Sequence, residues 1–168
     1  KGISIKNLWN ITNIKKALII VRKTTKTPYV SEIIRQLGFS SGSSKVTIYR
    51  PLLTKRIVEF FKSTNILDVC TGWGGRMLGT RAVDNTFYTG IEPCVKTYNG
   101  LINIIDKLKL DNIKIYNDTA ENILPKMPNN YYDIAITSPP YYNLEKYSDE
   151  PTQSINKYTT YELWYKYF

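Results

Sequence analysis

The chain has 168 residues, a formal net charge of +9, two cysteines and no histidine. Without histidine and without a paired-cysteine spacing, the composition excludes zinc clusters, disulfide frameworks and His-based triads, so we expect no metal site. The longest uninterrupted apolar run, Ala17 to Val21, is far too short to cross a membrane and no secretory start is present, so we expect an intracellular protein, cytoplasmic or in the host cell of a virus or phage, without a membrane partner.

The positive charge is concentrated near the start of the chain. Residues 1 to 48 carry nine Lys and Arg residues against the single acid Glu32, a net charge of +8, and the remaining 120 residues are nearly neutral. This distribution predicts an arm that contacts a polyanion, joined to a domain that binds something else; a solvated basic face is the alternative. The candidate phosphate contacts are Lys15, Lys16, Arg22, Lys23 and Lys26.

Two short helices are predicted within this arm. Apolar residues at three- and four-residue steps predict an amphipathic helix over residues 7–22, with Leu8, Ile11, Ile14, Leu18 and Val21 on its apolar face. A second helix is expected from about Val30 to Leu37, ended by Gly38. The pair is either a basic helical cap or a faint helix-turn-helix. Because the serine-rich stretch from Ser40 to Ser44 reads as a linker, we predict a helical N-terminal extension over residues 1–45 and a core over residues 46–168.

The core sequence alternates between strand and helix patterns. Pro51 suits the first turn of a helix that reaches Phe61. Continuous apolar runs predict strands over Ile66 to Cys70, Phe87 to Ile91, Ile113 to Tyr116 and Tyr132 to Thr137. Helices are expected to begin near Gly75, Cys94, Ala120 and Tyr158, the last with Tyr161, Trp164, Tyr165 and Phe168 as its bulky face. The pattern predicts an α/β fold, a Rossmann-like three-layer structure with a parallel sheet.

A glycine-rich turn follows the first predicted strand. Residues 66–76 read ILDVCTGWGGR, in which Gly72, Gly74 and Gly75 let the backbone approach a ligand closely. The run completes neither the GxGxxG dinucleotide fingerprint nor the GK[ST] of a phosphate loop. The sequence therefore predicts a nucleotide-type cofactor that has no pyrophosphate.

Carboxylates follow the next two predicted strands. Glu92 closes the second strand, where a carboxylate can accept hydrogen bonds from both hydroxyls of a ribose, although it could instead be an acid at a helix start before Pro93. Asp118 follows the third strand and could accept from an adenine amino group or cap the next helix. Because the ends of parallel strands meet at one edge of a sheet, we expect these acids to lie beside the glycine loop.

The fourth predicted strand ends in Ser138-Pro139-Pro140-Tyr141. Two successive prolines cannot donate ladder hydrogen bonds, so they end the strand and leave its last carbonyls free to accept protons. The ring of Tyr141 follows at once, and carbonyl acceptors beside an aromatic face suit a nucleobase with an exocyclic amino group. A rigid loop in which Tyr141 serves only for packing is the alternative.

These motifs, in this order, resemble the class I S-adenosylmethionine-dependent methyltransferases, and within them the exocyclic-amine DNA methyltransferases with an SPPY motif, over about residues 49–168. The resemblance implies a site-specific enzyme of the kind found in restriction–modification systems, acting on N4 of cytosine or N6 of adenine. It implies that the cofactor is bound by Asp68, Cys70, Thr71, Gly72, Trp73, Gly74, Glu92, Pro93, Asp118 and Thr119, and that the amine is held by Ser138, Pro139, Pro140 and Tyr141.

The chain departs from this family in its number of strands. A complete class I core has seven strands, and only four are predicted here. We therefore expect that C-terminal strands are missing because the chain is part of a longer protein, or that an additional subunit completes the sheet. An RNA base methyltransferase and a non-catalytic nucleic-acid-binding subunit remain alternatives, with DNA preferred over RNA as the partner.

Overall fold

The computed structural model describes residues 8–25, 27, 29–40, 48–142 and 146–167. The chain divides into two compact units, Lys1–Thr47 and Ile48–Phe168, which are considered separately. The predicted boundary between residues 45 and 46 lies outside the described residues, as do Lys26, Phe168 and most of the serine-rich stretch.

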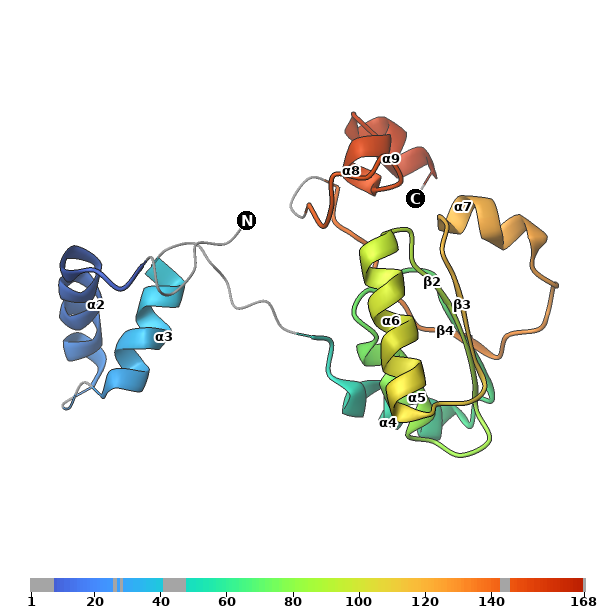
Figure 1. Cartoon of the computed structure of the whole chain (residues 1–168), viewed down its shortest axis with the longest axis horizontal. Coiled ribbons are helices and arrows are strands. Elements are labelled where there is room, and N and C mark those ends of the chain that lie inside the picture. The colour runs from blue at the N-terminus through green and yellow to red at the C-terminus, as the bar shows by residue number, and fades with distance from the viewer. Residues whose placement is uncertain (1–7, 26, 28, 41–47, 143–145, 168) are drawn as a thin grey trace. The chain divides into compact units, whose positions relative to one another are not determined.

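In the described part of the N-terminal unit, helices α2 (Ile11–Thr24) and α3 (Val30–Ser40) lie side by side (Figure 1). The Asn10 side chain accepts a hydrogen bond from the Asn13 amide at 3.0 Å, and this cap starts α2 later than the predicted residue 7. The predicted apolar face is wrong at Ile11, which is 73% exposed, because the buried side of the helix carries Ala17 and Val21.

The predicted end of the second helix at Gly38 is also wrong. Helix α3 continues through this glycine to Ser40. Glycine permits the left-handed turn that ends many helices but does not impose it, so a helix can continue through it.

The second unit is built on a four-stranded parallel sheet. Its strands are β1 (Asn65–Asp68), β2 (Phe87–Ile91), β3 (Ile113–Tyr116) and β4 (Ile134–Ala135), in the spatial order β3-β2-β1-β4. The predicted Rossmann-like α/β fold with a parallel sheet is confirmed. Strand β1 ends before Cys70 because residues 69 and 70 already form a turn, and β4 is shorter than predicted at both ends.

Helices join and flank these strands (Figure 1). In chain order they are α4 (Pro51–Phe61), α5 (Gly75–Arg81), α6 (Val95–Leu108), α7 (Ala120–Ile123), the 3₁₀ turn η1 (Leu124–Lys126), α8 (Ser154–Lys157) and α9 (Tyr161–Tyr167). The last helix starts three residues later than predicted, because Tyr158 lies at the end of the short helix α8. Within the described part of the chain, no helix is long and apolar enough to cross a membrane.

The hydrophobic core of this unit lies between the sheet and its helices. It is formed by Val58, Ile66, Met77, Tyr88 and Leu101. Helix α5 can approach the start of α4 closely because it presents glycines there: a Cβ added to Gly75 or to Gly79 would lie 2.2 Å from the carbonyl oxygen of Tyr49 or of Pro51, respectively.

Candidate functional site

The candidate site lies at the edge of the sheet where all four strands end. From β1 the chain passes to β2 and β3 on one side, then returns to place β4 on the other side of β1. In open parallel sheets, the crevice at such a reversal of strand order is the usual ligand site. By this rule we expect the ligand site between the carboxyl ends of β1 and β4, which lead into the glycine loop and the Ser-Pro-Pro-Tyr loop.

The glycine loop joins β1 to α5 in the conformation that its sequence predicts. Gly72 and Gly74 have φ angles of 58° and 81°, in the left-handed region where glycine is favoured. Helix α5 begins directly afterwards at Gly75. The loop backbone therefore has no Cβ at the two positions that turn it, which leaves room for a ligand to approach.

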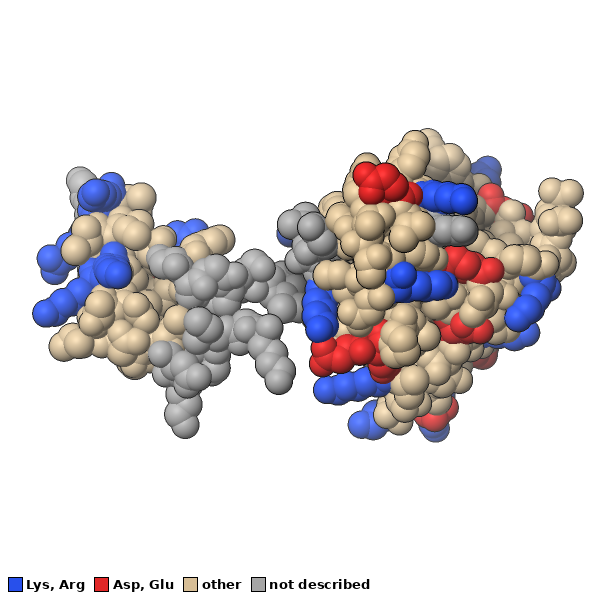
Figure 2. Space-filling model, turned by 90° about the horizontal axis from the view of Figure 1, so that it is seen from above, with Lys and Arg blue, Asp and Glu red and all other residues tan. Residues whose placement is uncertain are grey.

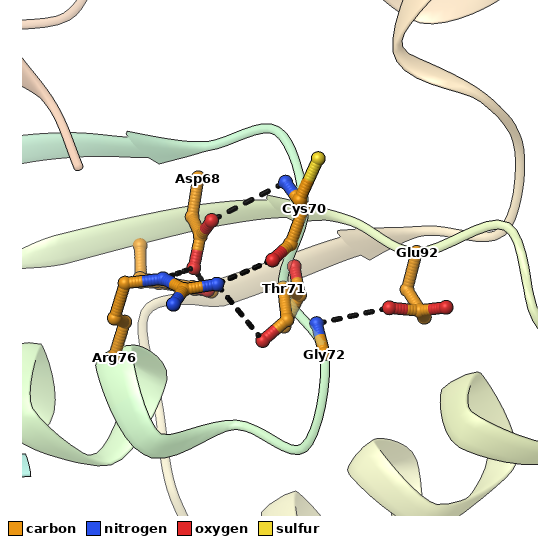
Figure 3. A network of polar contacts seen from close by, with 7 residues as sticks. Asp68, Cys70, Thr71, Gly72, Arg76 and Glu92 are labelled. Atoms are coloured by element: carbon orange, nitrogen blue, oxygen red, sulfur yellow. Dashed lines mark hydrogen bonds and ion pairs between the residues drawn. The ribbon is translucent and has the colours of Figure 1, made fainter. Parts of the chain in front are cut away.

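Asp68 is inside the protein rather than at the open edge. Its carboxylate is fully buried and accepts a hydrogen bond from Arg76 Nε at 2.7 Å (Figure 3). It also accepts one from the Tyr88 hydroxyl at 2.6 Å. A third, longer bond comes from the Cys70 amide at 3.3 Å. The buried carboxylate thus fixes the start of the loop through the Cys70 amide. Burial, together with the charge of Asp68, raises the pKa of Tyr88 well above its usual value.

Arg76 is a site residue that the sequence predictions missed. It is 5% exposed, and its guanidinium donates to the carbonyl oxygens of Cys70 and Thr71 as well as to Asp68. The guanidinium carbon also lies 5.1 Å from the ring centroid of Tyr49. One signal was present in the sequence: a charged residue in the otherwise apolar start of a predicted helix must find a buried partner.

Glu92 lies beside the glycine loop, as its position after β2 predicts. One carboxylate oxygen accepts from the Gly72 amide at 2.9 Å (Figure 3), and the other accepts from the Cys94 amide, also at 2.9 Å. The side chain is 7% exposed. Burial raises the pKa of Glu92 to about 7, although its two backbone hydrogen bonds act in the opposite direction.

Asp118 lies after β3 and interacts locally. Its carboxylate accepts from the Asn122 side chain at 2.8 Å and from the Thr119 amide at 2.7 Å, and these bonds lower its pKa. Thr119 is buried at the start of α7. The N-cap of α7 is Thr119 rather than Asp118, so Asp118 does not occupy the capping position, and no hydrogen bond or ion pair among the described residues joins its carboxylate to Glu92 or to the glycine loop.

The Ser-Pro-Pro-Tyr loop follows β4 at the edge of the sheet where the glycine loop follows β1. Strand pairing continues as far as Ile136, whose amide donates to the Leu67 carbonyl at 2.9 Å. The side chain of the next residue, Thr137, acts to lower the pKa of the Cys70 thiol, against the larger effect of burial. Burial raises the pKa of the Cys70 thiol to about 12, so this cysteine is neutral and unsuited to act as a nucleophile.

Beyond this junction the loop faces outward. Ser138, Pro139 and Tyr141 are exposed, and Pro140 is half-buried. Tyr141 has 63% of its surface accessible, so its ring is available for stacking.

Tyr142, directly after the Ser-Pro-Pro-Tyr motif, attaches the loop to Thr159 and to helix α9. The sequence predictions missed this residue too. Its hydroxyl donates to the Thr159 carbonyl at 3.0 Å. Its ring packs edge-to-face against Tyr161 of α9, with 5.7 Å between the centroids. Two adjacent tyrosines therefore differ: Tyr142 anchors the loop and Tyr141 is exposed.

Residues after the loop return to the start of α6. The Val95 amide donates to Glu150 at 3.2 Å, and Thr152 donates to the Pro93 carbonyl at 3.4 Å. A groove of about 810 Å³ opens here, and half-exposed Trp73 of the glycine loop forms part of its wall. The remaining wall comes from Cys94, Lys96, Thr97, Gly100, Leu101 and Ile104 and from residues 147–150.

Four of the five phosphate contacts predicted in the N-terminal unit lie on α2, and the fifth, Lys26, lies outside the described residues. Lys15, Lys16, Arg22 and Lys23 are exposed, and Figure 2 shows basic side chains across the visible face of this unit. The one acid in its described part, Glu32, forms an ion pair with Arg35 at 2.5 Å. The exposed positive charge of α2 is thus not neutralised by acids among the described residues of this unit.

Comparison with known proteins gives a similarity of fold only. No protein-family model matches the sequence, and the search of curated proteins finds no relative. Among solved structures, a Staphylococcus aureus protein whose proposed activity is that of a caffeoyl-CoA O-methyltransferase shares 17% identity and a TM-score of 0.48, covering 74% of this chain and 59% of its own.

Two further structures give similar values. A Podospora anserina methyltransferase bound to S-adenosylhomocysteine shares 17% identity and a TM-score of 0.46, over 72% of this chain and 49% of its own. An rRNA methylase from Streptococcus thermophilus shares 14% identity and a TM-score of 0.44, over 55% of this chain and 52% of its own. The chain therefore spans about half to three-fifths of these proteins, and such similarities do not assign a reaction.

Proposed function

We propose that the chain is an S-adenosylmethionine-dependent methyltransferase that acts on an exocyclic amino group of a nucleic-acid base, with DNA as the preferred substrate. The observation that carries this proposal is the parallel pairing of β1 with β4, which continues to the hydrogen bond from the Ile136 amide to the Leu67 carbonyl and so puts the glycine loop and the Ser-Pro-Pro-Tyr loop at adjacent strand ends. A cofactor held by the first loop would lie next to an amine held by the second.

The residues on the cofactor side fit S-adenosylmethionine. The loop offers backbone rather than charged side chains, which suits a cofactor without a pyrophosphate. The Glu92 carboxylate uses two of its roughly four acceptor positions for the Gly72 and Cys94 amides, so capacity remains for ribose hydroxyls. Asp68 is fully buried, and we therefore assign it to supporting the loop rather than to direct contact.

The residues on the acceptor side fit an amine. The bound cofactor supplies a methyl group already activated by a sulfonium, so alignment is the main task left to the protein. Ser138 and the Pro139 carbonyl would accept the amine's N–H bonds and turn its lone pair toward the crevice. Tyr141 would stack on the base after it leaves its helix.

The first test measures cofactor binding by calorimetric titration of the chain with S-adenosylmethionine. We expect micromolar binding, weakened roughly tenfold or more by Glu92→Gln, because hydrogen bonds to a charged acceptor contribute about 1.5–3 kcal/mol each. Glu59→Gln is the matched control, since Glu59 lies on α4 and makes only surface ion pairs with Lys55 and Arg56. Absence of binding by the folded native chain would rule out the proposal.

The second test measures transfer of a labelled methyl group to DNA and RNA oligonucleotides. We expect Ser138→Ala and Tyr141→Leu to reduce transfer while leaving cofactor affinity unchanged. Tyr131→Leu is the control, because Tyr131 is similarly exposed at 49% but precedes β4, at the opposite end of this strand. Transfer to RNA alone would favour the RNA alternative, and cofactor binding without transfer would favour a non-catalytic subunit.

A further inference from the structure

We infer that Arg76 is a positioning residue that fixes the shape of the glycine loop and thereby sets the affinity for the methionine part of the cofactor. This inference rests on the proposed function, and it adds the division that the family resemblance implies: the loop from Asp68 to Gly74 holds the methionine part, and Glu92 holds the ribose. Arg76 does not contact the cofactor in this assignment; it acts through the loop backbone.

The peptide unit that joins Thr71 to Gly72 is hydrogen-bonded at both of its polar atoms. Its carbonyl oxygen accepts from Arg76 Nη2 at 3.4 Å, and its amide donates to Glu92 at 2.9 Å (Figure 3). In a trans peptide the C=O and the N–H point in opposite directions. Arg76 and Glu92 therefore hold this one peptide unit from its two sides and oppose its rotation.

Arg76 also fixes the residues on both sides of that peptide. The same Nη2 atom donates to the Cys70 carbonyl, and Nε donates to Asp68 at 2.7 Å. The guanidinium faces the Tyr49 ring, whose own carbonyl oxygen lies against Gly75. One side chain thus connects the end of β1, the loop, the first turn of α5 and the segment before α4.

Lysine could not make this set of contacts. A guanidinium presents five N–H donors in a rigid planar fork, whereas an ammonium is a compact charge that cannot span acceptors so far apart. The substitution Arg76→Lys would keep the charge beside Asp68, so that no buried carboxylate loses its counter-ion, but would release the loop carbonyls. Glu92 would stay in place because the Cys94 amide still donates to it at 2.9 Å.

The test compares two ligands that differ in the methionine part of the cofactor. Calorimetric affinities for S-adenosylmethionine and for adenosine, which lacks the methionine part, are compared in the native chain and in Arg76→Lys. We expect the variant to weaken S-adenosylmethionine binding by about tenfold and adenosine binding by less than about threefold. A residue that only stabilises the fold would weaken both ligands by the same factor.

Helix α5 provides a matched control at its other end. Arg81 also donates to a backbone carbonyl, that of Thr86 at 2.9 Å, and also pairs with a carboxylate, that of Asp111. We expect Arg81→Lys to lower the thermal midpoint while leaving the ratio of the two affinities at its native value. An unchanged ratio in Arg76→Lys, or an equal change in Arg81→Lys, would overturn the inference.

A second variant covers the case in which Arg76→Lys does not fold. The double variant Asp68→Asn/Arg76→Gln then replaces it under the same criterion, because it removes both buried charges together. If the folded native chain binds neither ligand, the proposed function fails and this inference fails with it. If the native chain binds both ligands and the variant leaves the ratio of their affinities unchanged, the inference fails while the proposed function stands.

Discussion

At the scale of single residues, Glu92 has the most unusual environment in the candidate site. It is almost fully buried, and no basic side chain pairs with its carboxylate among the described residues; its partners are two backbone amides. Desolvation disfavours the charged form, which explains the rise of its pKa to about 7. The negative charge of Glu150, which lies 58 residues further along the chain, also raises the pKa of Glu92.

This environment predicts a dependence of stability on pH. Because the pKa of Glu92 is raised from 4.5 to about 7 on folding, the folded state binds more protons between these values and stability falls as pH rises through them. We expect the free energy of unfolding of the native chain to fall by about 3 kcal/mol relative to Glu92→Gln between pH 4.5 and pH 7.5. Urea denaturation at a series of pH values measures this difference. Parallel curves for the two proteins would contradict it.

Sequence reasoning located part of the site at this scale. The structure places the glycine loop against Glu92 and puts the Ser-Pro-Pro-Tyr loop at the neighbouring strand end, because strand ends of a parallel sheet share an edge. Which groups face a ligand could not be predicted, since that depends on contacts across the fold. The Asp68 carboxylate accepts hydrogen bonds from Arg76 and Tyr88, which lie eight and 20 residues further along the chain. Neither partner was recognised in the sequence.

At the scale of elements, the close packing of α4 and α5 depends on the absence of side chains. A Cβ at Gly79 would lie 2.2 Å from the Pro51 carbonyl oxygen and 2.7 Å from Thr54 Cβ. These are main-chain and β-carbon atoms that cannot rotate away. A methyl group at this position must therefore move one helix relative to the other.

We accordingly expect opposite effects from two alanine substitutions. Gly79→Ala should lower the free energy of unfolding by about 3 kcal/mol through overpacking. Gly100→Ala, within α6, should raise it by about 0.5–1 kcal/mol, because no atom lies within 4 Å of the added Cβ and alanine favours the helix. Urea denaturation tests both substitutions, and destabilisation of similar size in the two variants would be the contrary result.

The elements that were predicted correctly are those whose ends are set by local chemistry. Pro51 at the first turn starts α4, and β2 and β3 have the predicted bounds. Elements with ends set by tertiary contacts were predicted less well. Helix α3 passes Gly38, and β4 keeps only two residues because its pairing with β1 defines it.

At the scale of the whole molecule, the net positive charge is concentrated in the N-terminal unit. We propose that this unit contacts nucleic-acid phosphates through Lys15, Lys16, Arg22 and Lys23, which are exposed on α2. Neutralising a phosphate releases counter-ions from the nucleic acid, so the number of phosphates bound determines how steeply affinity falls with salt. The proposal can therefore be tested by salt dependence without knowledge of the recognition sequence.

Replacing these four residues by Gln should weaken DNA binding and flatten its dependence on salt. The slope of log K against log salt should change by about 0.9 for each phosphate that the variant no longer neutralises, up to roughly 4 in all. Fluorescence anisotropy with a labelled duplex measures the slope. The control replaces four exposed lysines of the second unit by Gln: Lys62, Lys107, Lys109 and Lys126. An equal change of slope in this control would count against a specific role of α2.

The short pairing of β4 has a consequence for how the two parts of the site respond to their ligands. Strand β1 pairs with β2 through four residues but with β4 only through Ile66–Ile134 and Leu67–Ala135. The glycine loop and Glu92 thus follow the well-paired part of the sheet, whereas the Ser-Pro-Pro-Tyr loop follows two ladder positions and the Ile136 amide bond and is held further on by Tyr142. We therefore expect the first part to be rigid before a ligand binds, and the second to adjust to the bound base at a small cost in strand pairing.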